Sequence, residues 1–556
     1  MYEQKQNSMK RLSKYASVIN LVLNDYSRKS TDETMMIKSF RKSNPESTNR
    51  KTHSENLENI AGLMAEGIGL NVPVVKLMAR YHDIGHTFLG HSGEWWLSEI
   101  KKNLGLGCYV HNSIGVRDLL YTHDVEKEIR DALYQFYGGE NQEDIENVCE
   151  DLWIIFDGIN SHNGELSDST YIPNFEKTKE DSKQELLKCH TKEGYDRSLI
   201  PGTAEASLMR LADKMVYIPF DMIDGLREGM IDRLDEEYID VLVPILTSDG
   251  TMTAEEAVRF VNNAVTKQKY NPLAHRLQLI FAKDVIQNST KEKIAMSEKM
   301  SERMHKLRDI NNEKVVKYVL MEEDHETYPK ALEELMHECK EIILKEKILR
   351  CLNGAEEDMR LSAELEEKYR DTPYFNFVKY IARTSSKDFE WTKNMVKEAQ
   401  KEAIEEELEE SLEVAKKNEV VGFAQGQEKR ARRIRFFAKV YREQIVKMKA
   451  RGYQLEDSDY EQMKAFQMAN SVPKLYPDMK ESMACEFGAK YLANLSDTEF
   501  MDLLKSTGKV SEEQEQSLTR KYKDIDLEKE YMTHGQWDKI SAEQSLARKG
   551  RSLGEE

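Results

Sequence analysis

The chain has 556 residues, enough for a large core and more than one domain. Its formal net charge of −19, with 33% charged residues, argues against a surface that coats nucleic acid throughout. No run approaches the roughly 20 apolar residues that span a bilayer, and the six cysteines form no CxxC pair. We therefore expect a cytoplasmic protein with reduced thiols and no membrane partner.

Scarce proline (11 residues) and recurring Glu, Lys, Leu, Met and Ala favour an all-α fold. The first clear amphipathic pattern predicts a helix over 54–70, with Ser54 as its N-cap. Asn71 and Pro73 interrupt the pattern, and a second helix is predicted from Val74 to about residue 83. Two antiparallel helices of this kind bring residues near 53 and 82 together.

Further helices are predicted at about 117–136, 143–160, 203–230, 253–267, 273–311 and 329–350. The polar stretch 164–200 is interpreted as a long loop that can cover a site as a lid.

The composition changes near residue 400. Seven glutamates lie in 402–413, and ten Lys/Arg lie in 429–451. We predict three parts: a catalytic domain at 1–400, a charged helical C-terminal extension at 401–505, and a polar, partly disordered tail at 506–556. Because aromatics are interleaved with arginines, 429–451 can pack against 402–413 or bind single-stranded nucleic acid by stacking; packing is the simpler interpretation.

The segment YHDIGHTFLGHSGE, residues 81–94, concentrates metal-seeking and proton-exchanging side chains. Imidazoles and carboxylates are good ligands for first-row divalent metals. His82 and Asp83 reach one ion only where the backbone turns, as beside Gly85. His53 upstream and Asp213, on the apolar helix ASLMRLADKMVYIPFD, complete a candidate set of four ligands.

In this order the motifs resemble those of the HD-domain phosphohydrolases, and within them the dGTPase-like deoxynucleotide triphosphohydrolases. The resemblance rests on RKTHS (50–54), YHDIGHTFLGHSGE (81–94), FDGINSHNGE (156–165) and PGTAEASLMRLADKMVYIPFDMIDG (201–225). It extends over residues 1 to about 400. It implies an HD-domain helical core.

The resemblance also implies roles for single residues. His53, His82, Asp83 and Asp213 match the metal ligands, and His91 and Glu94 match the catalytic pair. Being three residues apart, His91 and Glu94 share one face of a helix, where the carboxylate can orient the imidazole. Two further histidines, His86 and His111, are candidate catalytic residues, although His86 can equally be a hydrogen-bond partner of the ligands.

Four residues match substrate-binding positions. Arg50 and Lys214 would bind phosphate, Tyr217 would stack on the sugar, and Asp221 would bind a sugar hydroxyl. Tyr217 alone would more simply be a core residue. The short segment before His53 and the sequence YIARTSS (380–386) depart from the family pattern, which leaves base preference and oligomer contacts open.

The resemblance implies hydrolysis of a deoxynucleoside triphosphate to deoxynucleoside and tripolyphosphate. It implies one divalent transition metal (Mn, Fe, Co, Ni or Zn), Mg²⁺ with the triphosphate, a homo-oligomer, and a dNTP or single-stranded nucleic acid as activator. Two alternatives stay open. One is an HD hydrolase of another nucleotide phosphoester, and the other is an HD protein that senses nucleotides or nucleic acid without this activity.

Overall fold

The computed structural model describes residues 2–26, 36, 47–138, 141–163, 169–192, 194–316, 327–346, 348–349, 358–382, 384, 386–417, 428–450, 454–471 and 479–510. The helices are α1 (Tyr2–Asp25), α3 (Arg50–Ile68), α4 (Val72–Tyr81), α5 (His91–Asn103), α6 (His111–Arg117), α7 (Val125–Tyr137), α8 (Gln142–Asp151), α9 (Trp153–Asn160), α10 (Lys179–Thr191), α11 (Ala204–Arg227), α12 (Glu236–Leu246), α13 (Ala254–Thr266), α14 (Asn271–Asn288), α15 (Glu298–Asn311), α17 (Thr327–Lys345), α18 (Asp358–Tyr369), α19 (Phe375–Ala382), α20 (Ser386–Lys417), α21 (Glu428–Ala450), α22 (Asp457–Ser471), α23 (Met479–Ala493) and α24 (Asp497–Ser506).

Strands contribute little to the described residues. The strand β1 (Thr170–Tyr171) pairs antiparallel with β2 (Ile294–Ala295). A π-helical turn, η1 (Asp118–Thr122), follows α6, and a second, η4 (Asn312–Val316), follows α15; η3 (Tyr195–Ser198) is a 3₁₀ turn. The predicted all-α class with a helical C-terminal extension is confirmed.

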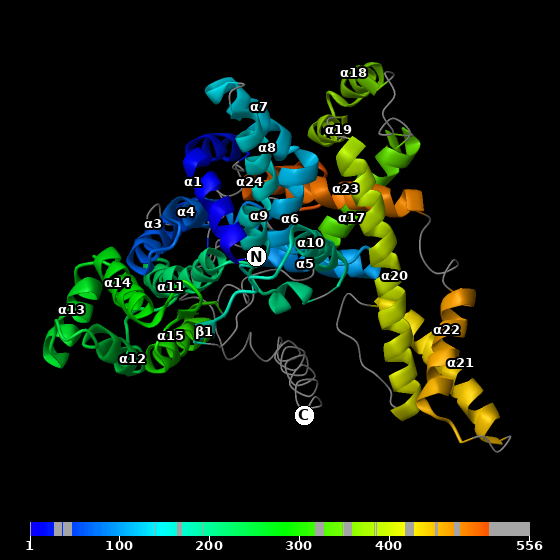
Figure 1. Cartoon of the computed structure of the whole chain (residues 1–556). Helices are drawn as coiled ribbons and strands as arrows, with labels where there is room; N and C mark the ends of the chain where they lie inside the picture. Colours follow the sequence, from blue (N-terminus) through cyan, green and yellow to red (C-terminus); the bar gives the residue numbers. More distant parts are fainter. Residues whose placement is uncertain are drawn as a thin grey trace.

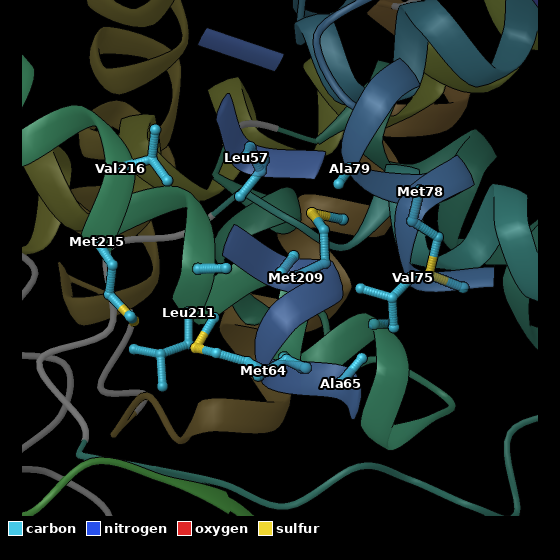
Figure 2. Close-up of a cluster of buried hydrophobic side chains, with 14 of the residues drawn as sticks. Leu57, Met64, Ala65, Val75, Met78, Ala79, Met209, Leu211, Met215 and Val216 are labelled. Carbon is cyan, nitrogen blue, oxygen red and sulfur yellow. The ribbon is translucent and has the colours of Figure 1, made fainter. Parts of the chain in front are cut away.

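The first hydrophobic cluster is built around α3, α4 and α11 (Figure 2). Leu57 and Met64 from α3 meet Met78 from α4 and Met209 from α11, all fully buried. Each such side chain stabilises the fold by roughly 1.5–3 kcal/mol when buried. This packing fixes the three helices that carry the predicted metal ligands.

The predicted pair of helices at 54–83 is present, but the first begins earlier than expected. The N-cap of α3 is Asn49, whose side chain accepts a hydrogen bond from the Thr52 amide, so the prediction of Ser54 as N-cap was wrong. Asn is as good a cap as Ser. The second helix begins at Val72, two residues before the predicted Val74, with Asn71 as its cap and Pro73 in the first turn.

Several longer predictions divide in the structure. The stretch 117–136 is the end of α6, the turn η1 and then α7; 143–160 divides into α8 and α9, and 273–311 into α14, β2 and α15. The predicted long loop at 164–200 is wrong in its middle, because α10 lies there with Thr178 and Asp181 forming a capping box. The helix α12 was not predicted.

A second hydrophobic cluster joins segments that lie far apart in the sequence. It contains Phe88, Trp96 and Leu97 together with side chains from α17, α19, the first part of α20, α23 and α24. The α23 and α24 helices thus pack against the segment that follows the HD motif. The predicted polar tail lies outside the described residues from residue 511 onward.

The third cluster lies between the second half of α20 and α21, with α22 beside them (Figure 1). Phe437 and Tyr441 are buried there, while Phe436 is exposed. Arg433 pairs with Glu407 at 2.6 Å across the two helices. The charged helices therefore pack together, which is the simpler of the two interpretations. Residue 400 falls inside α20, and the three-part division of the chain stays a proposal.

Five cysteines among the described residues are free: Cys108, Cys149, Cys189, Cys339 and Cys485. Cys351 lies outside the described residues. Among the described residues, no helix has the length and apolar character needed to cross a membrane.

Candidate metal centre and active site

The end of α4 presents the first candidate ligands. His82 is the residue after the last turn of α4, and its Nδ1 lies 2.8 Å from the main-chain oxygen of Ala79. A carbonyl oxygen only accepts, so Nδ1 carries the proton and the Nε2 lone pair faces the cluster. Nε2 makes no hydrogen bond among the described residues. It lies 3.3 Å from an Asp83 oxygen.

The other two candidate ligands come from neighbouring helices. His53, in the first turn of α3, places Nε2 at 2.9 Å from Oδ1 of Asp213 on α11. The same Asp213 oxygen lies 3.7 Å from Nε2 of His82. Ligand atoms about 2.0–2.2 Å from one ion are about 3–4 Å from one another. These separations fit a shared ion.

A metal ion also fits the burial and charge of the site. The ligand atoms of His53, His82 and Asp83 lie within 4.8 Å of one another, and all three side chains are buried. Asp213 lies outside that group of three but contacts both imidazoles. Burial alone would raise the pKa of Asp213, yet the His53 contact and the His82 imidazole outweigh it and hold the pKa at about 2. The carboxylate is therefore charged and ready to bind a cation.

A second set of side chains adjoins the first. His91 opens α5, and its Nδ1 lies 3.0 Å from Oε2 of Glu94. Glu94 also accepts the main-chain amide of His111 at 2.8 Å and contacts Nδ1 of the same ring at 3.1 Å. His91 is 70% exposed, whereas Glu94 is 13% exposed. One carboxylate thus orients a surface imidazole and a buried one.

The pKa values of His111 and His86 are shifted in opposite directions. Burial alone would lower the pKa of His111, but the Glu94 carboxylate outweighs burial and raises the pKa. His86 stacks on His111 with centroids 3.8 Å apart, and its Nε2 lies 3.3 Å from Asp83. Burial, with Arg50 and His111 nearby, holds the pKa of His86 well below 6.5, so the ring is neutral.

Gly85 lets the two sets approach each other. A Cβ at this position would lie 1.8 Å from the main-chain oxygen of His111, which no side chain tolerates. Tyr109 donates its hydroxyl to the Gly85 oxygen at 2.9 Å. The turn after His82 is therefore pressed against the start of α6, which brings Asp83 to 3.8 Å from Nε2 of His111.

The four predicted substrate-binding residues lie on α3 and α11, the helices that carry His53 and Asp213, and they differ in burial and in their hydrogen-bond partners. Arg50 is buried and donates from Nη1 to Asp83 at 2.8 Å. Lys214, also buried, donates to the hydroxyl of Tyr171 at 3.3 Å. Tyr217 is half-buried against the first cluster, and Asp221 is half-buried one turn further along α11. All twelve predicted site residues lie on α3, α5, α6, α11 or the end of α4 and the turn after it.

Sequence reasoning missed two residues at the site. His162, after α9, places Nε2 at 3.2 Å from Nε2 of His111, and the two share a possible ligand group with Asp83. Its Nδ1 faces the Ile159 carbonyl at 2.6 Å, and burial lowers its pKa to about 3. His162 stands in the motif FDGINSHNGE, which was the available signal. Tyr171 lies in β1, and nothing in its local sequence marks it.

Comparison with known proteins agrees with this geometry. Residues 50–215 match the family described as the HD domain. The chain is 26% identical over 284 residues to a deoxyguanosinetriphosphate triphosphohydrolase-like protein of Rickettsia felis, covering 48% of this chain and 64% of the relative. It is 28% identical over 285 residues to the protein of that name in Rickettsia bellii, and 25% over 282 residues to that in Caulobacter vibrioides, with the same coverage.

These matches span less than two thirds of each relative. The HD match contains ten of the predicted site residues, including all four candidate metal ligands and the His91–Glu94 pair, and it ends at residue 215, before Tyr217 and Asp221. The matched motifs, the helical fold and the buried His/Asp cluster agree with one another. Residues 50–215 of this chain therefore match an HD domain, and the chain is similar to proteins named deoxyguanosinetriphosphate triphosphohydrolase-like protein.

Proposed function

We propose that this chain is a metal-dependent hydrolase of deoxynucleoside triphosphates that releases deoxynucleoside and tripolyphosphate. The observation that carries the proposal is the convergence of His53, His82, Asp83 and Asp213 beside the His91–Glu94–His111 set. The relatives are named deoxyguanosinetriphosphate triphosphohydrolase-like proteins, and this name supports the same chemistry.

A divalent ion at the buried cluster would supply Lewis acidity toward water and phosphate. His53, His82, Asp83 and Asp213 would hold it. The metal expected is Mn, Fe, Co, Ni or Zn, and Mg²⁺ would accompany the triphosphate.

Proton transfer is assigned to His91, the exposed histidine of the site, together with Glu94. His91 is held by Glu94 through Nδ1, which leaves Nε2 to exchange a proton with water or with the leaving group. The charged, buried Glu94 raises the pKa of His111 and orients the His91 ring. General acid–base help of this kind contributes roughly a hundred- to ten-thousand-fold in rate.

Phosphate binding is assigned to Arg50 and Lys214. Arg50 uses Nη1 for Asp83, while its Nε makes no hydrogen bond among the described residues. A guanidinium has five N–H donors, so the same side chain can bind Asp83 and a phosphate together. Lys214 follows Asp213 on α11, and its ammonium is assigned to a phosphate of the same substrate.

The sugar is assigned to Tyr217 and Asp221, one and two turns beyond Asp213 on α11. A ring packed against C2′ leaves no room for a 2′-hydroxyl, and the carboxylate can accept a hydrogen bond from the 3′-hydroxyl. A hydroxyl buried without a partner costs roughly 1–3 kcal/mol. We expect a preference for deoxynucleotides of about tenfold or more.

The test compares kcat/KM for all four dNTPs with their ribonucleotide counterparts and identifies the phosphate product by chromatography. We expect tripolyphosphate, and a weaker deoxy preference in Tyr217→Ala. Equal kcat/KM for dGTP and GTP would overturn the deoxynucleotide assignment. Release of orthophosphate or pyrophosphate would point to another phosphoester hydrolase.

Assembly and activation belong to the same proposal. A homo-oligomer, and a dNTP or single-stranded nucleic acid as activator, follow from the resemblance to dGTPase-like proteins. The burial of Phe437 and Tyr441 between α20 and α21 removes two of the three aromatics that could stack on bases.

A further inference from the structure

The loop between His86 and His91 has an unusual main-chain conformation. Leu89 has φ of 55° and Gly90 has φ of 57°. A left-handed conformation is costly for a residue with a Cβ, and it persists where the surroundings determine it. Because Leu89 keeps this conformation two residues before His91, we expect contacts from other parts of the chain to fix the loop.

The contacts that hold the loop come from the distant C-terminal helix α24. Asp497, in its first turn, accepts the Leu89 amide through Oδ1 at 2.7 Å, across 408 residues of sequence. Phe500, one turn later, stacks on Phe88 with ring centroids 3.8 Å apart and planes 12° apart. Both phenylalanines are fully buried.

The loop in turn lies directly against α5. A Cβ at Gly93 would lie 2.1 Å from the main-chain oxygen of Phe88 and 3.1 Å from its ring. A displacement of Phe88 therefore moves the first turn of α5, which carries His91 and Glu94.

The other end of α5 is held by α23. Lys101 contacts Glu486 at 2.9 Å, and both side chains are at most 1% exposed. A buried pair of this kind is costly to break, because the remaining charge loses its partner. The α5 helix is thus fixed near both ends by α23 and α24.

We infer that α23 and α24 form a positioning element of the HD site, in which Asp497 and Phe500 hold the His86–His91 loop and thereby place His91 and Glu94. Asp497 is a positioning residue that acts through the Leu89 amide. The effect on turnover rests on the proposed function; the effect on the loop does not.

The test uses full-length variants at one position and a matched control. Asp497→Ala removes the acceptor, whereas Asp497→Asn keeps an acceptor oxygen and removes only the charge. Asp502→Ala is the control, because Asp502 is an exposed carboxylate on the same helix. Amide hydrogen exchange over residues 84–94, kcat and KM for dGTP, and the thermal midpoint are measured for each.

We expect Asp497→Ala to speed exchange of the Leu89 amide by about tenfold or more. It should lower kcat by about tenfold while KM changes less than about threefold, since small displacements of catalytic groups are costly. Asp497→Asn should stay within about threefold of the wild type in kcat. The thermal midpoint of Asp497→Ala should match that of Asp502→Ala, which excludes general destabilisation.

Wild-type exchange and kcat in Asp497→Ala would overturn the inference. So would a loss in Asp497→Asn as large as in Asp497→Ala, because charge and not the hydrogen bond would then matter. If the wild-type chain releases no tripolyphosphate from any dNTP, the proposed function fails. The exchange data then still decide whether α24 holds the loop.

Discussion

Two histidine rings of the site are oriented by the same kind of local hydrogen bond. His82 and His162 each follow a helix and face the carbonyl oxygen three residues earlier through Nδ1, at 2.8 Å and 2.6 Å. Each ring is left with an Nε2 lone pair that faces the cluster. The order of the motifs predicted His82, because it adjoins Asp83 in a dense segment. It did not predict His162, since its approach to His111 depends on how α6 and α9 pack.

The first prediction concerns metal binding by His82. His82→Ala removes a ligand from a site of buried donors, so the purified protein should lose the ion that the wild type carries. His337→Ala, a partly exposed histidine on α17, is the control and should keep its metal. Metal content is measured by elemental analysis. Stoichiometric metal in His82→Ala would show that His82 is not a ligand.

The second prediction concerns His91 and Glu94. His91→Ala and Glu94→Gln should keep the metal and lower kcat by at least roughly a hundredfold, because a proton carrier or its orienting carboxylate is lost. Steady-state kinetics with dGTP, together with metal analysis of the same samples, checks both statements. Turnover near the wild-type level in either variant would leave that residue a structural role only.

At the scale of elements, helix positions were easier to predict than helix ends. Continuous apolar patterns predicted α3, α4, α11 and α13, because apolar residues on the buried face of a helix recur every three to four positions. The pattern could not reveal the turn η1 inside 117–136, where the backbone changes without a proline or glycine. It also missed α10, whose buried face is short and whose mean character is polar. Residue 400 marks a change of composition within α20, since one helix crosses from the second cluster to the third.

The third prediction concerns the buried pair that joins α20 to α23. Lys490 lies 2.5 Å from Asp388. Burial and the nearby Arg117 disfavour its charged form, so its pKa falls from 10.5 to about 8 despite the Asp388 carboxylate. Between pH 8 and 10.5 the unfolded chain binds a proton that the folded chain has lost, so stability rises with pH.

The comparison is made with Asp388→Asn/Lys490→Met, which has neither ionisable group. From pH 7.5 to 9.5 the free energy of unfolding of the wild type should rise by about 1–2 kcal/mol relative to the double variant. Urea unfolding at each pH measures this difference. A difference that stays constant or falls over this range would contradict the lowered pKa.

At the scale of the whole molecule, the candidate ion would link α3, α4 and α11, three helices of the first hydrophobic cluster. His53, the residues after α4, and Asp213 on α11 come from separate elements, so an ion bound only by the folded chain stabilises all of them together. At a free concentration a hundredfold above its Kd, a ligand of this kind adds about 2.7 kcal/mol.

The fourth prediction follows from that linkage. Chelation should lower the thermal midpoint of the purified protein, and Mn²⁺ should restore it. His82→Ala should show neither response. Differential scanning calorimetry gives the midpoints. An equal rise with Mn²⁺ in wild type and His82→Ala would place the stabilising ion elsewhere.

The contact between Leu89 and Asp497 also sets an order of events during synthesis. When the ribosome has released the HD segment, Asp497 and Phe500 have still to be made, and Phe88, Trp96 and Leu97 lack much of their apolar cover. Contacts of such long sequence separation form slowly, and apolar surface stays exposed to solvent until they form. The nascent chain therefore carries its histidines long before it can hold their loop in place. The site is therefore complete only after α23 and α24 have been made and have packed. Until then the uncovered apolar side chains are a surface that chaperones can bind.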